Sequence, residues 1–489
     1  MPAKHIWQKF TKFQGTTGKN KMPEIIADNI SIINTNELEG TTRIDAEYYQ
    51  PKYLKVKGNL NHFKPLKFYT ENIIHPHEIK RIYSGYGETF LLTQNVRPLR
   101  LDFSTEVFIK EQDVQKLSRN ILKVGDVLIT RTGANFGDTA FYYNQRERIF
   151  ASSHVLIVRP NASIDGLYLA VFLNTKWGRK MLDRGMYGGL QPEIAPSYLK
   201  TIPIPRFVLT LEKDISQKVI ESLKYENLAN SLYSQAETLL LEELGIKDVD
   251  LSHEPCYEVN SVDTISANRI DAEYYQPKYE RVIEAIKKHP YKSVGDMFRL
   301  IKGIEPGSST YCEEGKPFIR VSNLNKFEIN NDNQQYLPEK NYSELKANYQ
   351  PLKSEILLSK DATPGIAYHL KEPIDGIISS GILRLQALSN IKREYICLVI
   401  NSIVGQSQSE RDSGGSVINH WKPSQVQNTL IPLLPDKIQE RIESLCLESH
   451  SARRQAKGLL EEAKRKVEEM IEKGNIKWDE KDVLKEINK

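Results

Sequence analysis

One stretch of eleven residues occurs twice in this chain without a single change. Residues 43–53 read RIDAEYYQPKY, and residues 269–279 read RIDAEYYQPKY again, 226 positions later. Eleven identities at one offset are not a coincidence of composition, so the chain contains an internal duplication. A repeat of that length holds a whole domain rather than one helical hairpin. The sequence therefore predicts two copies of one domain.

Weaker matches continue the duplication along the chain at nearly the same offset. LKVGDVLITR (122–131) corresponds to LKSEILLSK (352–360). The other aligned pairs are Phe90 with Phe318, Asn95 with Asn323, Ser152–Ser153 with Ser379–Ser380, Tyr168 with Tyr395, Asn174 with Asn401, Gly178 with Gly405, and Arg184 with Arg411. Each copy closes on two glycines and a proline motif, which are Gly188–Gly189 with IPIP (202–205) and Gly414–Gly415 with IPLLP (431–435).

A long apolar stripe at helical spacing follows each proline motif. The first covers about 211–245 and consists of Leu211, Ile215, Val219, Leu223, Leu228, Leu232, Ala236, Leu239 and Leu244. The second covers about 436–474 and forms a heptad seam of Ile438, Ile442, Leu445, Ser449, Ala452, Ala456, Leu459 and Ala463. Each stripe ends at a glycine, Gly245 or Gly474, as helix C-termini often do. Two such helices are expected to bury their stripes on each other as an antiparallel coiled coil.

Within each copy the pattern is mixed. Four short β-branched runs predict strands, at Val127–Thr130, Val155–Val158, Ile356–Ser359 and Gly381–Leu385. Single helices are predicted at 165–183 and 392–405. The fold class is therefore α+β, with two duplicated mixed domains separated and followed by long helices. The predicted divisions are an N-terminal extension (1–29), domain 1 (30–206), long helix 1 (207–245), a linker (246–268), domain 2 (269–435), and long helix 2 with the tail (436–489).

Charge is distributed unevenly although the net charge of the 489 residues is only +4. Residues 43–206 hold 24 Lys/Arg against 15 Asp/Glu, whereas 207–268 hold 4 against 12. Residues 269–435 hold 21 against 19. A basic block beside an acidic one suits a polyanion-binding domain joined to a segment that avoids polyanions, although chance drift of surface charge explains it equally well.

No sequence motif indicates catalysis, and the sequence predicts no cofactor and no metal site. The four cysteines contain no CxxC pair, which fits a reducing compartment rather than a disulfide scaffold. His75 and His77 flank a proline without a third ligand nearby, so a surface loop is the better interpretation. No apolar run reaches the roughly 20 residues of a membrane span, so we expect a cytoplasmic protein with no membrane partner.

The layout resembles the DNA-specificity subunit of type I restriction–modification systems. The resemblance rests on the repeated RIDAEYYQPKY, on KVGDVLITRTG (123–133), and on the two endings GG…IPIP and GG…IPLLP, and it covers about residues 30–475. It implies a non-catalytic subunit that binds double-stranded DNA. Each domain then reads one half of a split site, and the helices set the spacer and dock two methyltransferase subunits. Restriction subunits bind through the methyltransferase.

The sequence departs from that family in two ways, because the second repeat carries a balance of only +2 and because the segment after one strand differs between the copies. Phosphate contacts are therefore expected to be uneven between the halves. Where domain 1 has Arg131-Thr132-Gly133, domain 2 has Lys360-Asp361-Ala362. Arg131 and Lys360 end strands at matched places, where each either contacts DNA or is merely a solvated cation. The other DNA-binding candidates have amide, guanidinium or phenol groups, some of which form turns instead, and they are Gln94, Asn95, Arg97, Arg100, Tyr187, Gln191, Arg320, Asn323, Asn325 and Asn419.

Two other functional classes fit the same pattern. A duplicated coiled-coil scaffold that binds only proteins agrees with the small net charge. The recognition subunit of another DNA-modifying system agrees with the duplication. RIDAEYYQPKY is identical in two domains that would read different sequences, so its role is expected to be structural or partner-docking rather than base reading.

Overall fold

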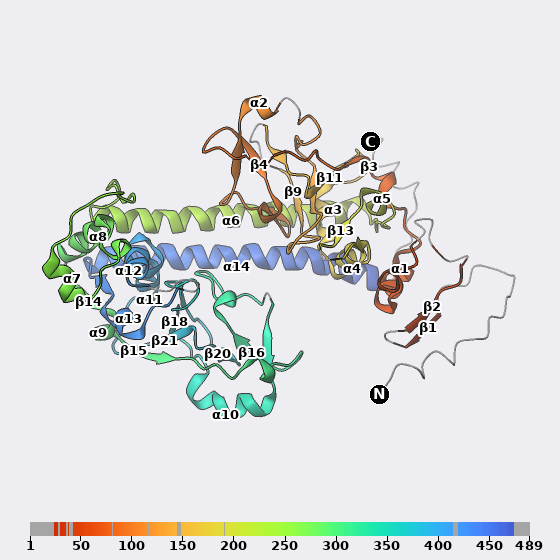
Figure 1. The fold of residues 1–489 in the computed structure, drawn as a ribbon. Helices are drawn as coiled ribbons and strands as arrows, with labels where there is room; N and C mark the ends of the chain where they lie inside the picture. Colours follow the sequence, from red (N-terminus) through yellow and green to blue (C-terminus); the bar gives the residue numbers. More distant parts are fainter. Residues whose placement is uncertain are drawn as a thin grey trace. The chain divides into compact units, whose positions relative to one another are not determined.

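The computed structural model describes residues 24–27, 30–35, 38, 43–80, 82–114, 117–143, 148–189, 191–331, 333–413 and 419–473. Most of the predicted N-terminal extension (1–29), Gly414–Gly415, Gly474 and the tail lie outside these residues. The chain divides into two compact units, which Figure 1 shows. Unit 1 takes the residues up to Leu223 and those from Lys457 onward, and unit 2 takes Lys224–Ala456.

A four-stranded antiparallel sheet of order β3-β11-β8-β9 forms the centre of unit 1. Its strands are β3 (Thr70–Ile74), β8 (Val127–Thr130), β9 (Thr139–Phe141) and β11 (Val155–Pro160). A second sheet of order β10-β4-β7 contains one parallel pair, β10 with β4. Its strands are β4 (Glu88–Leu91), β7 (Val107–Ile109) and β10 (Phe150–Ala151).

Unit 2 repeats both sheets strand for strand. The four-stranded sheet has the order β15-β21-β18-β19, and the three-stranded sheet has the order β17-β16-β20, with β16 and β20 parallel. The strands are β15 (Phe298–Lys302), β16 (Lys316–Ile319), β17 (Gln335–Leu337), β18 (Ile356–Ser359), β19 (Ala367–His369), β20 (Ile377–Ile378) and β21 (Ile382–Ala387). The duplication predicted from the eleven-residue motif is therefore present in the strand order.

Each predicted single helix is in fact two helices, so that prediction was wrong in both units. Unit 1 has α3 (Gly166–Leu173) and α4 (Lys176–Arg184), and unit 2 has α11 (Arg393–Asn401) and α12 (Ile403–Asp412). A hydroxyl residue makes each break, because it caps the second helix and bonds back to the first. Thr175 Oγ1 donates to Phe172 O and accepts from Gly178 N, and Ser402 does the same with Val399 and Val404.

The aligned glycines follow from that break. A Cβ on Gly178 would lie 2.2 Å from Phe172 O, and one on Gly405 would lie 2.4 Å from the backbone of Ile400. No side chain fits between helices that turn so closely on each other.

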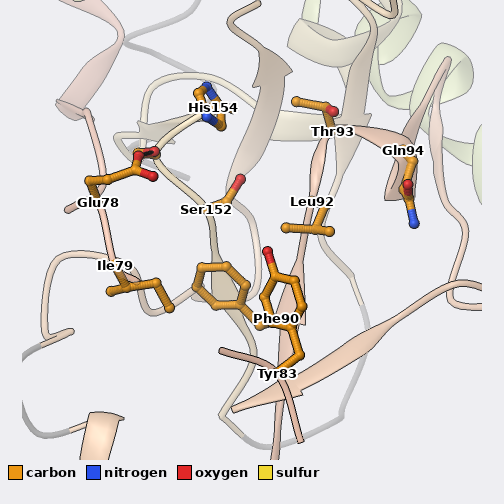
Figure 2. Close-up of a pocket in the computed structure, with 10 residues that line it drawn as sticks. Glu78, Ile79, Tyr83, Phe90, Leu92, Thr93, Gln94, Ser152 and His154 are labelled. Atoms are coloured by element: carbon orange, nitrogen blue, oxygen red, sulfur yellow. Dashed lines mark hydrogen bonds between the residues drawn. The ribbon is translucent and has the colours of Figure 1, made fainter. Parts of the chain in front are cut away.

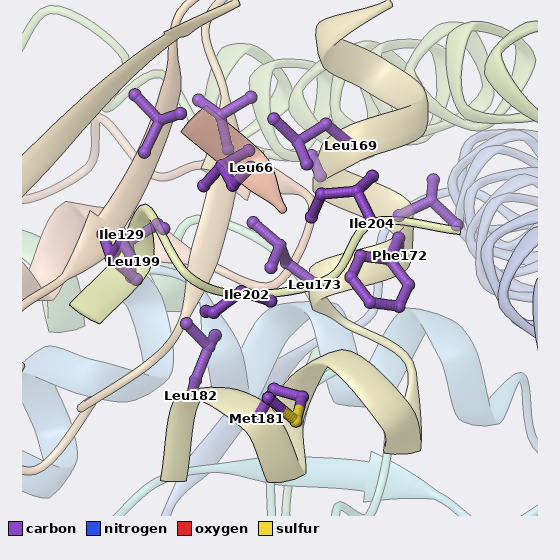
Figure 3. Packing of buried hydrophobic residues seen from close by; sticks show 14 of the residues in the cluster. Leu66, Ile129, Leu169, Phe172, Leu173, Met181, Leu182, Leu199, Ile202 and Ile204 are labelled. Carbon is purple, nitrogen blue, oxygen red and sulfur yellow. The ribbon is translucent and has the colours of Figure 1, made fainter. Parts of the chain in front are cut away.

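The proline motifs run through the hydrophobic cores. Figure 3 shows Ile202 and Ile204 of the first motif packed among α3 and α4 side chains in unit 1. Tyr168 Oη donates to Pro205 O at 2.5 Å, and Tyr395 Oη donates to Pro432 O at 2.8 Å. The aligned tyrosines therefore do one structural job in both units, since each satisfies a buried carbonyl at the end of its core.

Two long helices, α6 (Leu209–Glu243) and α14 (Asp436–Lys473), match the predicted long helices within two residues. In unit 1, Ile215 and Val219 share a core with Ala463 and Val467. The ion pairs Asp214–Lys466 (2.6 Å) and Lys218–Glu462 (3.1 Å) run in opposite directions along the two helices, so their segments are antiparallel.

In unit 2, the other segments of α6 and α14 also pack together. Ser449 Oγ donates to Ala229 O at 2.7 Å, and Arg453 bonds to Asn230. The predicted α14 seam is confirmed, because its members in both units are buried or half-buried. The predicted α6 stripe is wrong at Leu228, which is 48% exposed. Leu228 follows Leu223 by five positions, a step that does not fit the heptad spacing of three or four. The buried stripe continues instead through Ala229, Tyr233, Ala236 and Leu240.

The arginine of the repeated RIDAEYYQPKY motif binds the C-terminal end of a helix in both units. Arg43 Nε bonds to Asp45 at 2.8 Å, and Arg43 also donates to Gly185 O just beyond α4. Arg269 bonds to Asp271 at 2.8 Å and donates to Asp412 O at the end of α12. A cation at a helix C-terminus is stabilised by the exposed carbonyls there. These contacts agree with the structural role expected for the motif.

The remaining helices and strands are short. They are β1 (Glu24–Ala27), β2 (Ile30–Ile32), η4 (Ala46–Tyr49), α1 (Pro51–Leu60), η5 (Leu66–Phe68), α2 (Glu111–Val114), α5 (Pro196–Leu199), α7 (Ser261–Ala267), η7 (Ala272–Tyr275), α8 (Pro277–Lys287), β14 (Tyr291–Ser293), α9 (Val294–Met297), η8 (Ser308–Thr310), α10 (Glu339–Tyr349), α13 (Pro423–Asn428) and β22 (Leu430–Pro432). No helix in the described part of the chain is long and apolar enough to cross a membrane.

Candidate nucleic-acid interface

Polar loops gather at one end of the strands of the four-stranded sheet in each unit. We call this end of the sheet the loop edge. In unit 1 it is the edge where β3 and β8 end and β11 begins, since Ile74 and Thr130 lie beside the start of β11. Arg131 N donates to His154 O at 2.8 Å there. In unit 2 the same bond joins Lys360 N to Gly381 O at 2.9 Å. The two strand-end cations therefore occupy equivalent positions.

A glycine-bearing loop of unit 1 and Asn419 of unit 2 lie beside these cations. In unit 1 the loop joins β12 (Met186–Tyr187) to β13 (Glu193–Ile194), and Ile194 N donates to Arg131 O at 3.2 Å. Tyr187 and Gln191 of this loop are exposed. In unit 2, exposed Asn419 accepts through its carbonyl from Ala362 N at 3.0 Å. The structure thus brings Arg131 together with the Tyr187 loop, and Lys360 together with Asn419.

Both strand-end cations are ion-paired within the protein. Arg131 contacts Glu193, and Lys360 lies 2.5 Å from Asp361, which also accepts from His420 at 2.9 Å. Burial opposes ionisation of Asp361, but the hydrogen bonds and charges of Lys360 and His420 outweigh it and lower its pKa. The Arg131 and Lys360 side chains are only 15% and 9% exposed. Their contact with DNA stays a prediction.

A tight hairpin follows β4 in unit 1 and β16 in unit 2. In unit 1 it contains η6 (Thr93–Asn95), β5 (Val96–Arg97) and β6 (Arg100–Leu101), and in unit 2 it begins with η9 (Val321–Asn323). Fully buried Asn95 accepts from Leu92 N at 2.8 Å and donates to Asp102 O at 2.8 Å. Asn323 is equally buried and accepts from Arg320 N at 3.1 Å. Both asparagines form the turn, which was the alternative to base contact.

The outer positions of the hairpin differ between the units. Arg97 lies directly opposite Arg100, and two like charges in that register repel each other unless an anion lies between them. Burial opposes ionisation of Asp102, but bonds from Ser104 and the charges of the two arginines lower its pKa. At the equivalent positions unit 2 has Asn325 and Glu328, joined by a backbone bond of 3.0 Å. Only the unit 1 hairpin presents a pair of cations.

The remaining two candidate DNA-binding residues each make a hydrogen bond within their own unit. Exposed Gln94 donates to Thr105 O at 3.3 Å, and Arg320 donates to Asn333 O at 2.7 Å. Both bonds use a single donor of a side chain that carries several, so each side chain keeps further donors.

A depression at the loop edge of unit 1 encloses about 130 Å³, and we call it the Glu78 pocket. Figure 2 shows the Ser152 hydroxyl and the Glu78 carboxylate on the space that Phe90 and Tyr83 also line. Its lining residues are Glu78, Ile79, Tyr83, Phe90, Leu92, Thr93, Gln94, Ser152, Ser153 and His154. Ser153 Oγ donates to the Glu78 carboxylate.

One lining atom of this pocket, Ser152 Oγ, is buried and has no hydrogen-bond partner among the described residues. Four other such atoms belong to residues at or just after the ends of β3 and β8, and they are His75 Nε2, Thr130 Oγ1, Arg131 Nε and Thr132 Oγ1. Burial, with the nearby Arg131 charge, lowers the pKa of His75 and keeps its ring neutral. Buried polar atoms without partners are rare in folded proteins, and they mark places where water or a ligand binds.

Sequence reasoning did not select Glu78, Ser152 or Glu193 as site residues. The repeated Ser-Ser pair before a strand was visible in both copies, and Glu78 follows His75-Pro-His77 directly. Only the antiparallel pairing of β3 with β11 shows that these segments meet. His77 uses its backbone N to bond to Asn120 Oδ1 at 3.1 Å. No group of three or more His, Cys, Asp or Glu side chains in the described ranges is arranged to hold a metal ion.

No protein-family model matches the sequence, and no curated protein matches it either. Solved structures that match include type I restriction–modification S subunits at low sequence identity. The S subunit from M. genitalium is 11% identical, with a TM-score of 0.40, and the match covers 84% of this chain and 96% of that chain. The HsdS subunit from Thermoanaerobacter tengcongensis is 14% identical, with a TM-score of 0.29 and coverage of 85% and 97%. The type IIG restriction endonuclease BpuSI is 12% identical, with a TM-score of 0.28 and coverage of 42% and 36%.

Proposed function

We propose that this chain is the DNA-specificity subunit of a type I restriction–modification system. Each unit reads one half of a split site in double-stranded DNA through its loop edge and hairpin. The long helices set the spacer between the halves and dock two methyltransferase subunits, through which restriction subunits bind. Methylation, ATP use and cleavage belong to those partners, and this chain is not an enzyme.

The duplication is the single observation that carries this proposal. Both sheets recur strand for strand, the same eleven residues clamp a helix end in each unit, and a long helix follows each copy. Duplex DNA has twofold symmetry of its own, so a protein with two related domains can offer one to each half of a site. One small domain reaches only a few base pairs, and a rare site therefore needs two.

The differences between the units support reading of two different half-sites. Polar side chains at the loop edges and hairpins vary, whereas the buried residues that form the same turns do not. Unit 1 has Arg97 and Arg100 at the positions where unit 2 has Asn325 and Glu328. Sequence information in DNA is read by such exposed donors and acceptors, and phosphate is held by the cations.

Domain exchange with mapping of methylated sites tests the proposal. Residues 269–435 are replaced by the corresponding domain of a relative, and the full chain is combined with its methyltransferase subunits. We expect one half of the methylated sequence to change and the other half and the spacer to stay as they were. The matched control exchanges residues 43–206, which should change the opposite half.

Two results would contradict the proposal. Changes in both halves after a single exchange would show that reading is not modular. Absence of DNA binding at any salt concentration would favour the protein-binding scaffold, because phosphate contacts strengthen steeply as salt is lowered.

A further inference from the structure

We propose that the Glu78 pocket of unit 1 receives the ring of a single cytosine that has left the base stack. This inference rests on the proposed function and names one base that unit 1 reads. The apolar residues of the pocket would stack on the ring, and the polar residues would select the base.

The size of the pocket favours a single six-membered ring. It encloses about 130 Å³, and an engineered cavity of about 150 Å³ in another protein holds benzene. A purine adds a second ring and exceeds that space. A stacked base shows only its edge in a groove, so a ring-sized space is filled only when the base is unstacked.

The walls suit an aromatic ring. Phe90 is 2% exposed and lies at the base of the pocket lining, and its ring centroid is 6.5 Å from that of Tyr83. Leu92 and Ile79 complete the apolar lining. Unstacked bases in proteins lie against aromatic and apolar side chains of this kind, which replace the stacking energy of the duplex.

The polar groups favour cytosine over thymine. Glu78 offers carboxylate oxygens that can only accept, and a carboxylate pairs with the amino group at N4 of cytosine. Thymine places a carbonyl oxygen and a methyl group there, and the carboxylate would repel that oxygen. Ser152 is 5% exposed, its hydroxyl lines the pocket, and it has no partner among the described residues. That hydroxyl can donate to the ring nitrogen or carbonyl oxygen of cytosine.

Unit 2 keeps an aromatic pair, because Tyr311 and Phe318 match Tyr83 and Phe90 with ring centroids 5.4 Å apart, and Tyr311 Oη donates to Glu305 at 3.0 Å. It differs from unit 1 at two polar positions of the lining. Val321 stands where unit 1 has Thr93, and Gly381 stands where it has His154. A Cβ on Gly381 would lie 2.8 Å from the Val321 side chain, and Ile304 forms a β-bridge with Ser379. Val321 and Ile304 therefore supply apolar neighbours at this place in unit 2. The polar lining differs between the units at these positions, as a specificity feature of one half-site requires.

The test uses the full chain with its methyltransferase subunits and the half-site that domain exchange assigns to unit 1. A 2-aminopurine placed beside each cytosine of that half-site brightens when its neighbour leaves the stack. We expect one position to brighten several-fold on binding. Glu78→Gln should lower the preference for cytosine over thymine at that position about tenfold. Ser152→Ala should lower it by a smaller factor, and it removes no bond that the described residues make.

Glu111→Gln serves as the matched control, since it removes one exposed carboxylate from the same unit outside the pocket. It should leave the preference unchanged. The inference is overturned if the half-site contains no cytosine on either strand, or if no 2-aminopurine brightens. It is also overturned if Glu78→Gln and Ser152→Ala bind DNA with an unchanged preference. Absence of any half-site preference in the unmodified chain would instead defeat the proposed function.

Discussion

The hairpins after β4 and β16 have the same frame and opposite surface chemistry. The frame is a backbone bond from Asp102 N to Asn95 O at 2.8 Å in unit 1, and from Asn330 N to Asn323 O at 2.9 Å in unit 2. The duplicated chain has kept the buried amide that forms the turn. Exposed side chains touch few neighbours and change at little cost in stability. Duplication therefore preserves a fold while it frees the surface for two different targets.

A buried acid at matched positions is paired differently in the two interiors. Arg159 bonds to Asp126 in unit 1, and Arg384 bonds to Glu355 in unit 2, each through two nitrogens. The two acids hold matched positions, but the two arginines do not, because the strand pairing makes Arg159 equivalent to Gln386. Each unit still pairs its buried acid, because a buried charge cannot be left without a partner. Unit 2 alone adds Glu394 at the place that Leu167 occupies in unit 1.

The largest expected effect separates the two buried pairs. Arg384→Met leaves Glu355 buried and unpaired, and we expect it to lower the free energy of unfolding of unit 2 by about 3–5 kcal/mol. Arg159→Met should cost less, since the Arg159 side chain is 17% exposed against 5% for Arg384. Hydrogen exchange resolved by unit, in increasing urea, measures both. Equal losses of stability in the two variants would show that burial of the arginine does not control the cost. The double variant Arg384→Met with Glu355→Leu should recover part of the stability.

Acid should weaken unit 2 before unit 1. Glu394 is 3% exposed and contacts His369, His450 and Lys371. Burial and the Lys371 charge lower the pKa of His369 to about 3 and that of His450 to about 4. The unfolded chain takes up these protons near pH 6.5, so stability is full above that pH and falls between about 6.5 and 4.

The loss should reach about 2–3 kcal/mol for each histidine. Unit-resolved hydrogen exchange between pH 7 and 4.5 measures it, after correction for the intrinsic exchange rate. His450→Gln should flatten the pH dependence of unit 2 and leave unit 1 as it was. A dependence equally steep in both units would remove the Glu394 cluster as its cause.

The hairpin cations should matter for DNA in unit 1 only. Arg97→Ser and Arg100→Ser should each weaken binding by about 1 kcal/mol on all sequences, and each should lower the salt slope by about one. The controls are Asn325→Ser and Glu328→Gln in unit 2, which remove no cation and for which we expect no decrease in the salt slope. Titrations at several salt concentrations give both quantities. A loss confined to one base position would show that the arginines read a base instead of holding phosphate.

Arg131 and Lys360 should give the smallest effect. Each is largely buried and ion-paired with its own carboxylate, so little of its side chain is available to contact DNA. We expect Arg131→Ala and Lys360→Ala to change DNA affinity by less than about 1 kcal/mol. Binding to the mapped site and to its single-base variants measures this. A loss of about 1–3 kcal/mol at one base pair would instead indicate direct base contact by that residue.

Much of the fold could be predicted from repetition and spacing. Strands 127–130 and 356–359 were predicted with the observed bounds, and the α14 seam follows the heptad letters. Hydrophobic periodicity and β-branched runs determine the conformation of their own segment, so they can be recognised in the amino-acid sequence. The break at Thr175 and at Ser402 was missed, because a hydroxyl in a helical run is a cap only when its side chain turns back.

The residues of the site depended on tertiary structure. Asn95 and Arg97 are two letters apart and equally polar, yet the turn buries the first completely and leaves the second half-buried. Glu78 and Ser152 are 74 positions apart, and they line one pocket only because β3 pairs with β11. The sequence by itself determined the duplication, the mixed fold and the long helices, since those arise from repeated local patterns. Strand pairing decided which side chains meet, because contacts between residues distant in the chain produce no local periodicity in the sequence.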